Sequence, residues 1–251
     1  MTRALEQREK RARIKALLES KGLDALILKK GANVAWIIGG RAHIPTTLEL
    51  ACLDVIVYKD RIVVVTNKIE APRLEAEELS GDEDLIVINW FEGRDGQLPS
   101  GEKIGIDGPD NDRINLSAEV EELRRSLNSF EVERLKQIGS DAAKSLGESM
   151  LKISPEMSEV AAAGVIAENL WAHNLEPVVL LVAGSERIES FRHPLPTTSL
   201  IGSIFMGVIC ARRKGLIASV TRIVSFNSLS KEIEQRYLHD QTQLQTATTS
   251  R

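Results

Sequence analysis

Apolar and polar positions change period several times in the first part of the chain. Residues 6–21 carry apolar side chains at helical spacing and end at a glycine, which predicts an amphipathic helix. Short apolar runs rich in β-branched residues follow, and such runs predict strands. The expected strands are residues 23–28, residues 33–40 with the pattern Asn-Val-Ala-Trp-x-x-Gly, and a hairpin of residues 53–58 and 61–66.

Further elements of both kinds follow the hairpin. Residues 69–79 have helical spacing, and residues 85–90 and 103–107 are apolar runs that predict strands. An alternation of strands and helices is typical of an α/β domain. We expect this domain to occupy residues 1–127.

A second helical start signal, Asn128-Ser129, marks the predicted domain boundary. A long helix is expected over residues 130–151, a second helix over residues 158–173, and a strand over residues 178–183. Residues 128–251 then form the second domain.

Two runs with the composition of β-strands follow in this second domain. Residues 204–211 and 216–226 flank the charged turn Arg212-Arg213-Lys214-Gly215, which predicts another hairpin. The loop Phe-Arg-His-Pro-Leu-Pro-Thr, residues 191–197, leads into the first of these strands.

Composition limits the class of partner. The chain has 251 residues, of which 43% are hydrophobic, so one or two packed domains are expected. A net charge of −4 argues against nucleic-acid binding. The N-terminal segment is charged rather than apolar, and no apolar run approaches the roughly 20 residues of a membrane span. A cytoplasmic location is therefore expected, with Cys52 and Cys210 as reduced thiols.

The order of these elements resembles a known superfamily. The first part of the chain resembles the N-terminal domain of creatinase and prolidase. It contains, in order, a helix, Gly-Leu-Asp-Ala-Leu-Ile-Leu, Asn-Val-Ala-Trp-x-x-Gly, a hairpin and a helix. Residues 204–226 resemble the first metal-binding hairpin of the pita-bread hydrolases, which include aminopeptidase P and methionine aminopeptidase. The resemblance implies an α/β N-terminal creatinase-like domain followed by the first half of an α+β pita-bread domain. The later half, which supplies further His and Glu ligands in the family, is not in this sequence, so we expect a truncated chain.

Two expectations concern the last residues. Residues 228–236 have the pattern of the start of a next helix, and residues 241–250 are polar and predict a frayed end. A half-sheet also leaves a strand edge and apolar surface to cover, which favours a homodimer or a remodelled tail.

The metal ligands of the resembled family are absent from the hairpin. In metallopeptidase members each strand carries one Asp, eleven positions apart, and the second precedes a Thr-Arg pair by two residues. Thr221-Arg222 is present here, but the Asp positions fall on Val208 and Ser219. Neither side chain replaces a bridging carboxylate, so no cofactor is expected, although Mn, Co or Zn stays an alternative. A two-residue shift places Cys210 near the first ligand position, where a buried structural cysteine is the favoured interpretation.

The resemblance also supplies candidate site residues. It implies that His193 hydrogen-bonds substrate or serves as the acid/base, as in the metal-free creatinases; the alternative is a loop histidine bonded to carbonyls. Arg192 is a candidate for binding a carboxylate, or else an exposed arginine. Ser219 is a hydrogen-bond donor in the place of the Asp. By analogy with creatinase-like dimers, Arg41 and His43 reach a partner's substrate, or else they cap a strand end.

Three functions follow from different classes. The first is a creatinase- or aminopeptidase-like hydrolase of a small amide or peptide C–N bond, without the dinuclear metal site. The second is an inactive homologue that acts as a binding or scaffold module. The third, an Xaa-Pro metallopeptidase, needs the Asp pair and is disfavoured by Val208 and Ser219. The expected partner is a small-molecule or short-peptide substrate. Because fold alone does not fix chemistry, the resemblance indicates the family more firmly than the activity.

Overall fold

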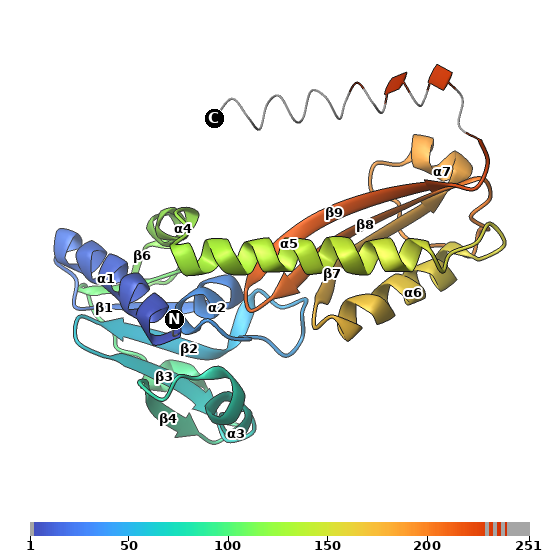
Figure 1. Cartoon of the computed structure of the whole chain (residues 1–251). Coiled ribbons are helices and arrows are strands. Elements are labelled where there is room, and N and C mark those ends of the chain that lie inside the picture. Colours follow the sequence, from blue (N-terminus) through green and yellow to red (C-terminus); the bar gives the residue numbers. More distant parts are fainter. Residues whose placement is uncertain (1–2, 229–230, 233–234, 237–238, 240–251) are drawn as a thin grey trace. The chain divides into compact units, whose positions relative to one another are not determined.

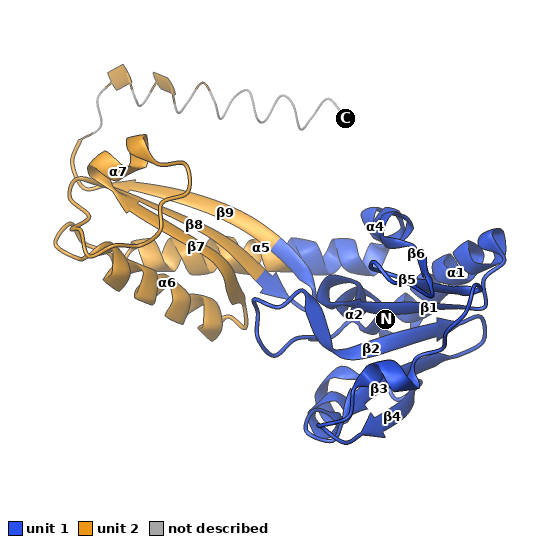
Figure 2. Ribbon diagram, turned by 180° about the vertical axis from the view of Figure 1, so that it is seen from behind, with its two compact units in different colours: residues 1–137, 212–217 blue, residues 138–211, 218–251 orange. Residues whose placement is uncertain are grey.

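The chain forms two compact units. A computed structural model describes residues 3–228, 231–232, 235–236 and 239 (Figure 1). One unit contains residues 1–137 and 212–217, and the other contains residues 138–211 and 218–251 (Figure 2). The predicted helix at residues 228–236 lies partly outside the described residues, and the polar stretch 241–250 lies wholly outside them.

The first unit contains a mixed sheet. Its strand order is β4-β3-β2-β1-β5-β6. Neighbours β1–β2 and β2–β3 are antiparallel, whereas β3–β4, β1–β5 and β5–β6 are parallel. The strands are β1 Ala25–Lys30, β2 Leu50–Tyr58, β3 Ile62–Asn67, β4 Asp84–Ile88, β5 Ile104–Ile106 and β6 Ile114–Asn115. The expected strands at residues 23–28, 53–58, 61–66, 85–90 and 103–107 are thereby confirmed.

Helices of this unit pack on the sheet. They are α1 Arg3–Lys21, α2 Gly31–Ile38, α3 Ala71–Arg73 with the π-helical η1 Leu74–Glu78, the 3-10 turn η2 Arg94–Gln97 and α4 Ser117–Arg125. One apolar cluster joins α1, α2 and α4 to one sheet face through residues such as Ile14, Ile37 and Val120. A second cluster, which includes Ile27, Val65 and Leu98, covers the opposite face.

The predicted strand at residues 33–40 is wrong, because this segment forms helix α2. Residues 33–38 are all buried, so the segment lacks the one-sided pattern that separates a helix from a buried strand. Gly39 ends the helix in the left-handed conformation, with φ of 64°, and its N–H donates to the Ala35 carbonyl. Gly39, the last residue of the Asn-Val-Ala-Trp-x-x-Gly pattern, is therefore a helix C-cap.

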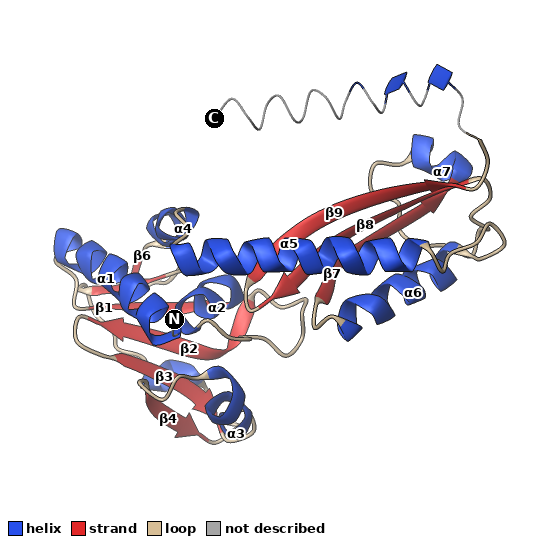
Figure 3. Cartoon of the chain, viewed as in Figure 1, coloured by secondary structure: helices blue, strands red, loops and turns tan. Residues whose placement is uncertain are grey.

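The second unit is a layer of helices against a small sheet. Its elements are α5 Ser129–Met150, which runs through both units, α6 Glu159–Ala172, β7 Glu176–Gly184, α7 Ser185–Ser190, β8 Ile204–Arg213 and β9 Leu216–Ser225. The strand order is β7-β8-β9 (Figure 3). A Cβ atom on Gly207 would lie 2.7 Å from Met150 Cε and 3.3 Å from Ile166 Cδ1, so α5 and α6 pack closely on this face of β8. The long helices and the last hairpin are confirmed.

No helix in the described ranges combines the length and the apolarity needed to cross a membrane.

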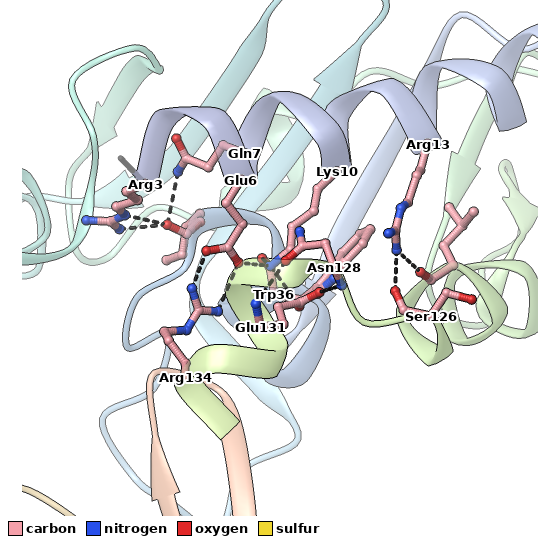
Figure 4. A network of polar contacts seen from close by, with 12 residues as sticks. Arg3, Glu6, Gln7, Lys10, Arg13, Trp36, Ser126, Asn128, Glu131 and Arg134 are labelled. Atoms are coloured by element: carbon pink, nitrogen blue, oxygen red, sulfur yellow. Dashed lines mark hydrogen bonds and ion pairs between the residues drawn. The ribbon is translucent and has the colours of Figure 1, made fainter. Parts of the chain in front are cut away.

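A buried network of charges joins α1 to the start of α5 (Figure 4). Lys10 is only 1% exposed, and its Nζ lies 2.5 Å from Glu6 Oε1 and 2.9 Å from Glu131 Oε1. It also donates to the Trp36 carbonyl over 2.8 Å. A buried ammonium requires such partners, because desolvation would otherwise favour its neutral form.

The start of α5 is stabilised by a capping box. Asn128 Oδ1 accepts from the Glu131 N–H over 2.9 Å, and the Asn128 N–H donates to Glu131 Oε2 over 3.1 Å. Glu131 therefore serves two roles, since its other oxygen pairs with Lys10. The cap that predicted the helix start also connects α5 to α1.

Glu6 receives both Lys10 and the Arg134 guanidinium. Burial opposes ionisation, but hydrogen bonds from Arg134 and Lys10 outweigh it and hold the pKa of Glu6 below its usual value. Glu6 is thus an ionised carboxylate between two cations.

We expect Glu6→Gln to lower the free energy of unfolding by about 3 kcal/mol, because the substitution leaves buried cations without their counter-charge. Urea denaturation measures this loss. Glu9→Gln, an exposed position on the same helix, is the matched control and should change stability by less than about 0.5 kcal/mol.

The stability lost in Glu6→Gln should depend on pH in one direction only. Because the pKa of Glu6 is lower in the folded than in the unfolded chain, its stabilisation is complete above the unfolded value of about 4.3 and disappears as the pH falls through the folded value. The difference between wild type and Glu6→Gln should therefore shrink in acid. A difference that grows as the pH falls would contradict the assignment.

Candidate functional site

The turn between β8 and β9 sets the register of the hairpin. Lys214 and Gly215 both have positive φ, 48° and 81°, as a two-residue type I′ turn requires. Arg213 therefore faces Leu216, and counting back places Cys210 opposite Ser219 and Val208 opposite Thr221. The 3.2 Å distance between Cys210 Sγ and Ser219 Oγ agrees with this register.

These four residues lie on the sheet face that points away from α5 and α6. Phe205, Ile209 and Ala211 are fully buried on the helix side, whereas the alternate positions Met206, Val208 and Cys210 are only partly buried. Cys210 is half-buried and Ser219 is exposed. The predicted buried structural cysteine at position 210 is therefore wrong, because strand alternation turns this side chain outward.

The outer face of the hairpin is neutral at the positions where the resemblance places carboxylates. Val208 supplies no ligand atom, and Ser219 and Cys210 contact each other. Within the described residues, no group of three or more His, Cys, Asp or Glu side chains is arranged to hold a metal ion. A bridging dinuclear site needs anionic oxygen ligands, and the described residues of this hairpin do not fit one.

His193 and Arg192 lie in the exposed loop between α7 and β8. Their neighbour Pro194 is buried, which fixes the loop at one point. No hydrogen bond between His193 and Ser219 occurs in the part of the chain that the structure describes. The role of His193 stays a prediction.

A buried carboxylate holds this loop. Glu159, at the start of α6, is fully buried. Its Oε2 accepts from the Thr197 N–H over 3.0 Å and from the Thr197 hydroxyl over 2.7 Å, and it pairs with the Arg187 guanidinium. Its Oε1 accepts from the Gly184 N–H over 2.8 Å. Arg187 in turn donates to the Leu195 carbonyl over 3.1 Å.

Glu159 and Arg187 therefore tie residues 195–197 to α6 and to the end of β7. Sequence reasoning missed both residues. The available signal was Ser158, whose side chain caps α6 by accepting from the Ala161 N–H over 3.2 Å. An acidic residue directly after an N-cap is common, so the pattern alone does not reveal that Glu159 is buried.

Arg41 and His43 lie in the first unit, after α2, and each has a defined contact. Arg41 Nε lies 2.6 Å from Glu78 Oε1, and its backbone N–H donates to Glu78 Oε2 over 2.8 Å. Glu78 is 2% exposed, so both contacts join the start of this loop to a buried carboxylate. His43 Nε2 lies 2.7 Å from an Arg212 nitrogen, so the imidazole accepts from the guanidinium. The structure thus brings His43 to the β8 end of the hairpin turn.

Comparisons with known proteins give the fold. No family model matches the sequence, and no curated protein matches it. Among solved structures, the X-Pro aminopeptidase from Thermotoga maritima is similar with a TM-score of 0.70 and 16% identity, covering 90% of this chain and 67% of that one. The prolidase from Pyrococcus horikoshii gives a TM-score of 0.72 and 14% identity over 90% and 67%. The cytosolic X-prolyl aminopeptidase from Caenorhabditis elegans, described as having a di-nuclear active site, gives 0.60 and 15% over 91% and 42%.

The chain has the prolidase fold. An α/β N-terminal domain followed by a partial pita-bread domain is thus confirmed, as the sequence resemblance implied. The chain spans about two thirds of the length of the first two of these structures. At these identities the similarity establishes the fold, and the chemistry must be argued from the residues.

We expect Glu159→Gln to loosen the loop that carries His193. The amide keeps the side-chain volume but loses the charge that faces Arg187, which should lower stability by about 3 kcal/mol. Backbone amide exchange at Thr197 and Gly184 should accelerate more than exchange in β8. Glu168→Gln, an exposed position on the same helix, is the control. Unchanged exchange at Thr197 would show that other contacts hold the loop.

Proposed function

We propose that this prolidase-fold protein is a hydrolase of a small amide or peptide C–N bond that works without a dinuclear metal site. The fold of prolidases and X-Pro aminopeptidases supports the hydrolase class. The observation that carries the proposal is the neutral Cys210–Ser219 pair on the outer face of the hairpin. Mn, Co or Zn remains the alternative cofactor, but the hairpin residues described do not fit a bridged pair of ions.

The chemistry then requires a proton donor and acceptor. His193 is the candidate, because an imidazole side chain is the common general acid/base in proteins and this loop is solvent-exposed. Water attacks the carbonyl carbon while His193 accepts its proton and returns it to the leaving nitrogen. The hydroxyl of Ser219 donates a hydrogen bond to substrate, and Arg192 binds a substrate carboxylate.

The partner subunit completes the proposed site. In a cytoplasmic homodimer, Arg41 and His43 of one protomer contact the substrate of the other. Their contacts with Glu78 and Arg212 support this role by giving both side chains a defined position. The substrate class is a small molecule or a short peptide.

The second candidate is an inactive homologue that serves as a binding or scaffold module. The hairpin residues favour it, because Val208, Cys210 and Ser219 supply none of the carboxylates that activate water in a metallopeptidase. Xaa-Pro metallopeptidase activity is the third and weakest candidate, because Val208 and Ser219 replace its carboxylates.

Turnover separates the first two candidates. With a panel of X-Pro dipeptides and small amides, we expect wild-type hydrolysis, and His193→Ala should lower kcat by about 100-fold or more. Ser219→Ala should have a smaller effect. His173→Gln is the control, because this histidine caps α6 through a bond to the Asn169 carbonyl. Binding of panel members without hydrolysis would support the module, and full activity of His193→Ala would remove His193 from the chemistry.

A further inference from the structure

The first unit contains a small cavity that the proposed hydrolase site does not use. Its volume is about 150 Å³, and it lies between α2, the start of α5 and the turn of the last hairpin. All of its lining residues belong to this unit. Its charged and hydrogen-bonding lining consists of Lys10, Trp36, Arg124, Glu131, Arg134 and Lys214.

Positive charge exceeds negative charge in this lining. Four cations face one carboxylate, Glu131, and that carboxylate already pairs with Lys10. Arg134 is paired with Glu6, outside the lining. Lys214, in the hairpin turn, forms no ion pair with any carboxylate of the described residues.

Arg124 forms no ion pair with a carboxylate of the described residues. Its guanidinium donates to the neutral amide oxygen of Asn33 over 2.8 Å. Burial lowers the pKa of Arg124, and Glu121, Glu131 and Asp107 only partly oppose this effect. A nearby anion would stabilise the charged guanidinium of Arg124, which burial destabilises.

Two buried donors of the lining have no acceptor among the residues that the structure describes. Trp36 is 7% exposed, and its Nε1 has no hydrogen-bond partner. Arg134 Nε is also buried without a partner. A buried donor without an acceptor destabilises the folded state, so such groups in folded proteins normally meet a ligand or an ordered water.

We propose that this cavity binds a small oxyanion. Excess positive charge selects an anion, and unpartnered N–H groups select an oxygen acceptor. The volume admits a carboxylate or phosphate group but not a peptide. The site is separate from the neutral face of the β8–β9 hairpin and does not depend on the proposed hydrolase activity.

The test is a titration of the intact protein with sodium phosphate and with sodium acetate at constant ionic strength, against sodium chloride. We expect a saturable heat signal and a rise in Tm with at least one oxyanion but not with chloride. The stronger of the two ligands distinguishes phosphate chemistry from carboxylate chemistry. Lys214→Gln should weaken binding about tenfold, because a charged hydrogen bond is lost.

Matched variants keep the result interpretable. Lys68→Gln, an exposed lysine of the same unit, should leave the affinity unchanged. Trp36→Phe keeps an aromatic ring without the N–H and should weaken binding in a protein that still unfolds cooperatively. Equal affinity in wild type and Lys214→Gln, or no saturable signal beyond that of chloride, would overturn the proposal and assign the cavity to water.

Discussion

The two-residue turn Lys214-Gly215 is the constraint on which the site depends. Positive φ at both residues fixes a type I′ geometry, and the geometry fixes the pairing of β8 with β9. A slip of one residue would turn every side chain of a strand to the opposite face. The turn is held at its other side as well, because a Cβ atom on Gly215 would lie 2.9 Å from the Ala35 Cβ of α2. Glycine is therefore required both by conformation and by space.

That register gives the hairpin its chemistry. Apolar Phe205, Ile209 and Ala211 fill the side toward the helices, and the outward side receives Val208, Cys210 and Ser219. The same scaffold that presents metal-binding carboxylates in the resembled family thus presents neutral groups here. Buried charges are used elsewhere, in the Glu6–Lys10–Glu131 network and at Glu159, where they hold elements together.

Patterns between neighbours in sequence were enough to predict much of this structure. The last hairpin, the long helix after Asn128 and the α/β alternation follow from local spacing and capping. The same reasoning gave the wrong element for residues 33–38, because their complete burial removes the alternation of apolar and polar positions that separates a helix from a strand. The contacts of Glu159 with Thr197, and of His43 with Arg212, join residues 38 and 169 positions apart, and no local pattern predicts such pairings. The roles of His193 and Ser219 are predictions that rest on the resemblance.

Metal content tests the neutral hairpin most directly. Protein isolated from its natural source without added metal should be analysed for Mn, Co, Fe and Zn after dialysis against a chelator. We expect a substoichiometric metal content and the same Tm before and after the dialysis, because Val208 and Ser219 do not form a bridged metal site. Tightly bound metal at one or two ions per chain would contradict the metal-free assignment and restore the metallopeptidase alternative.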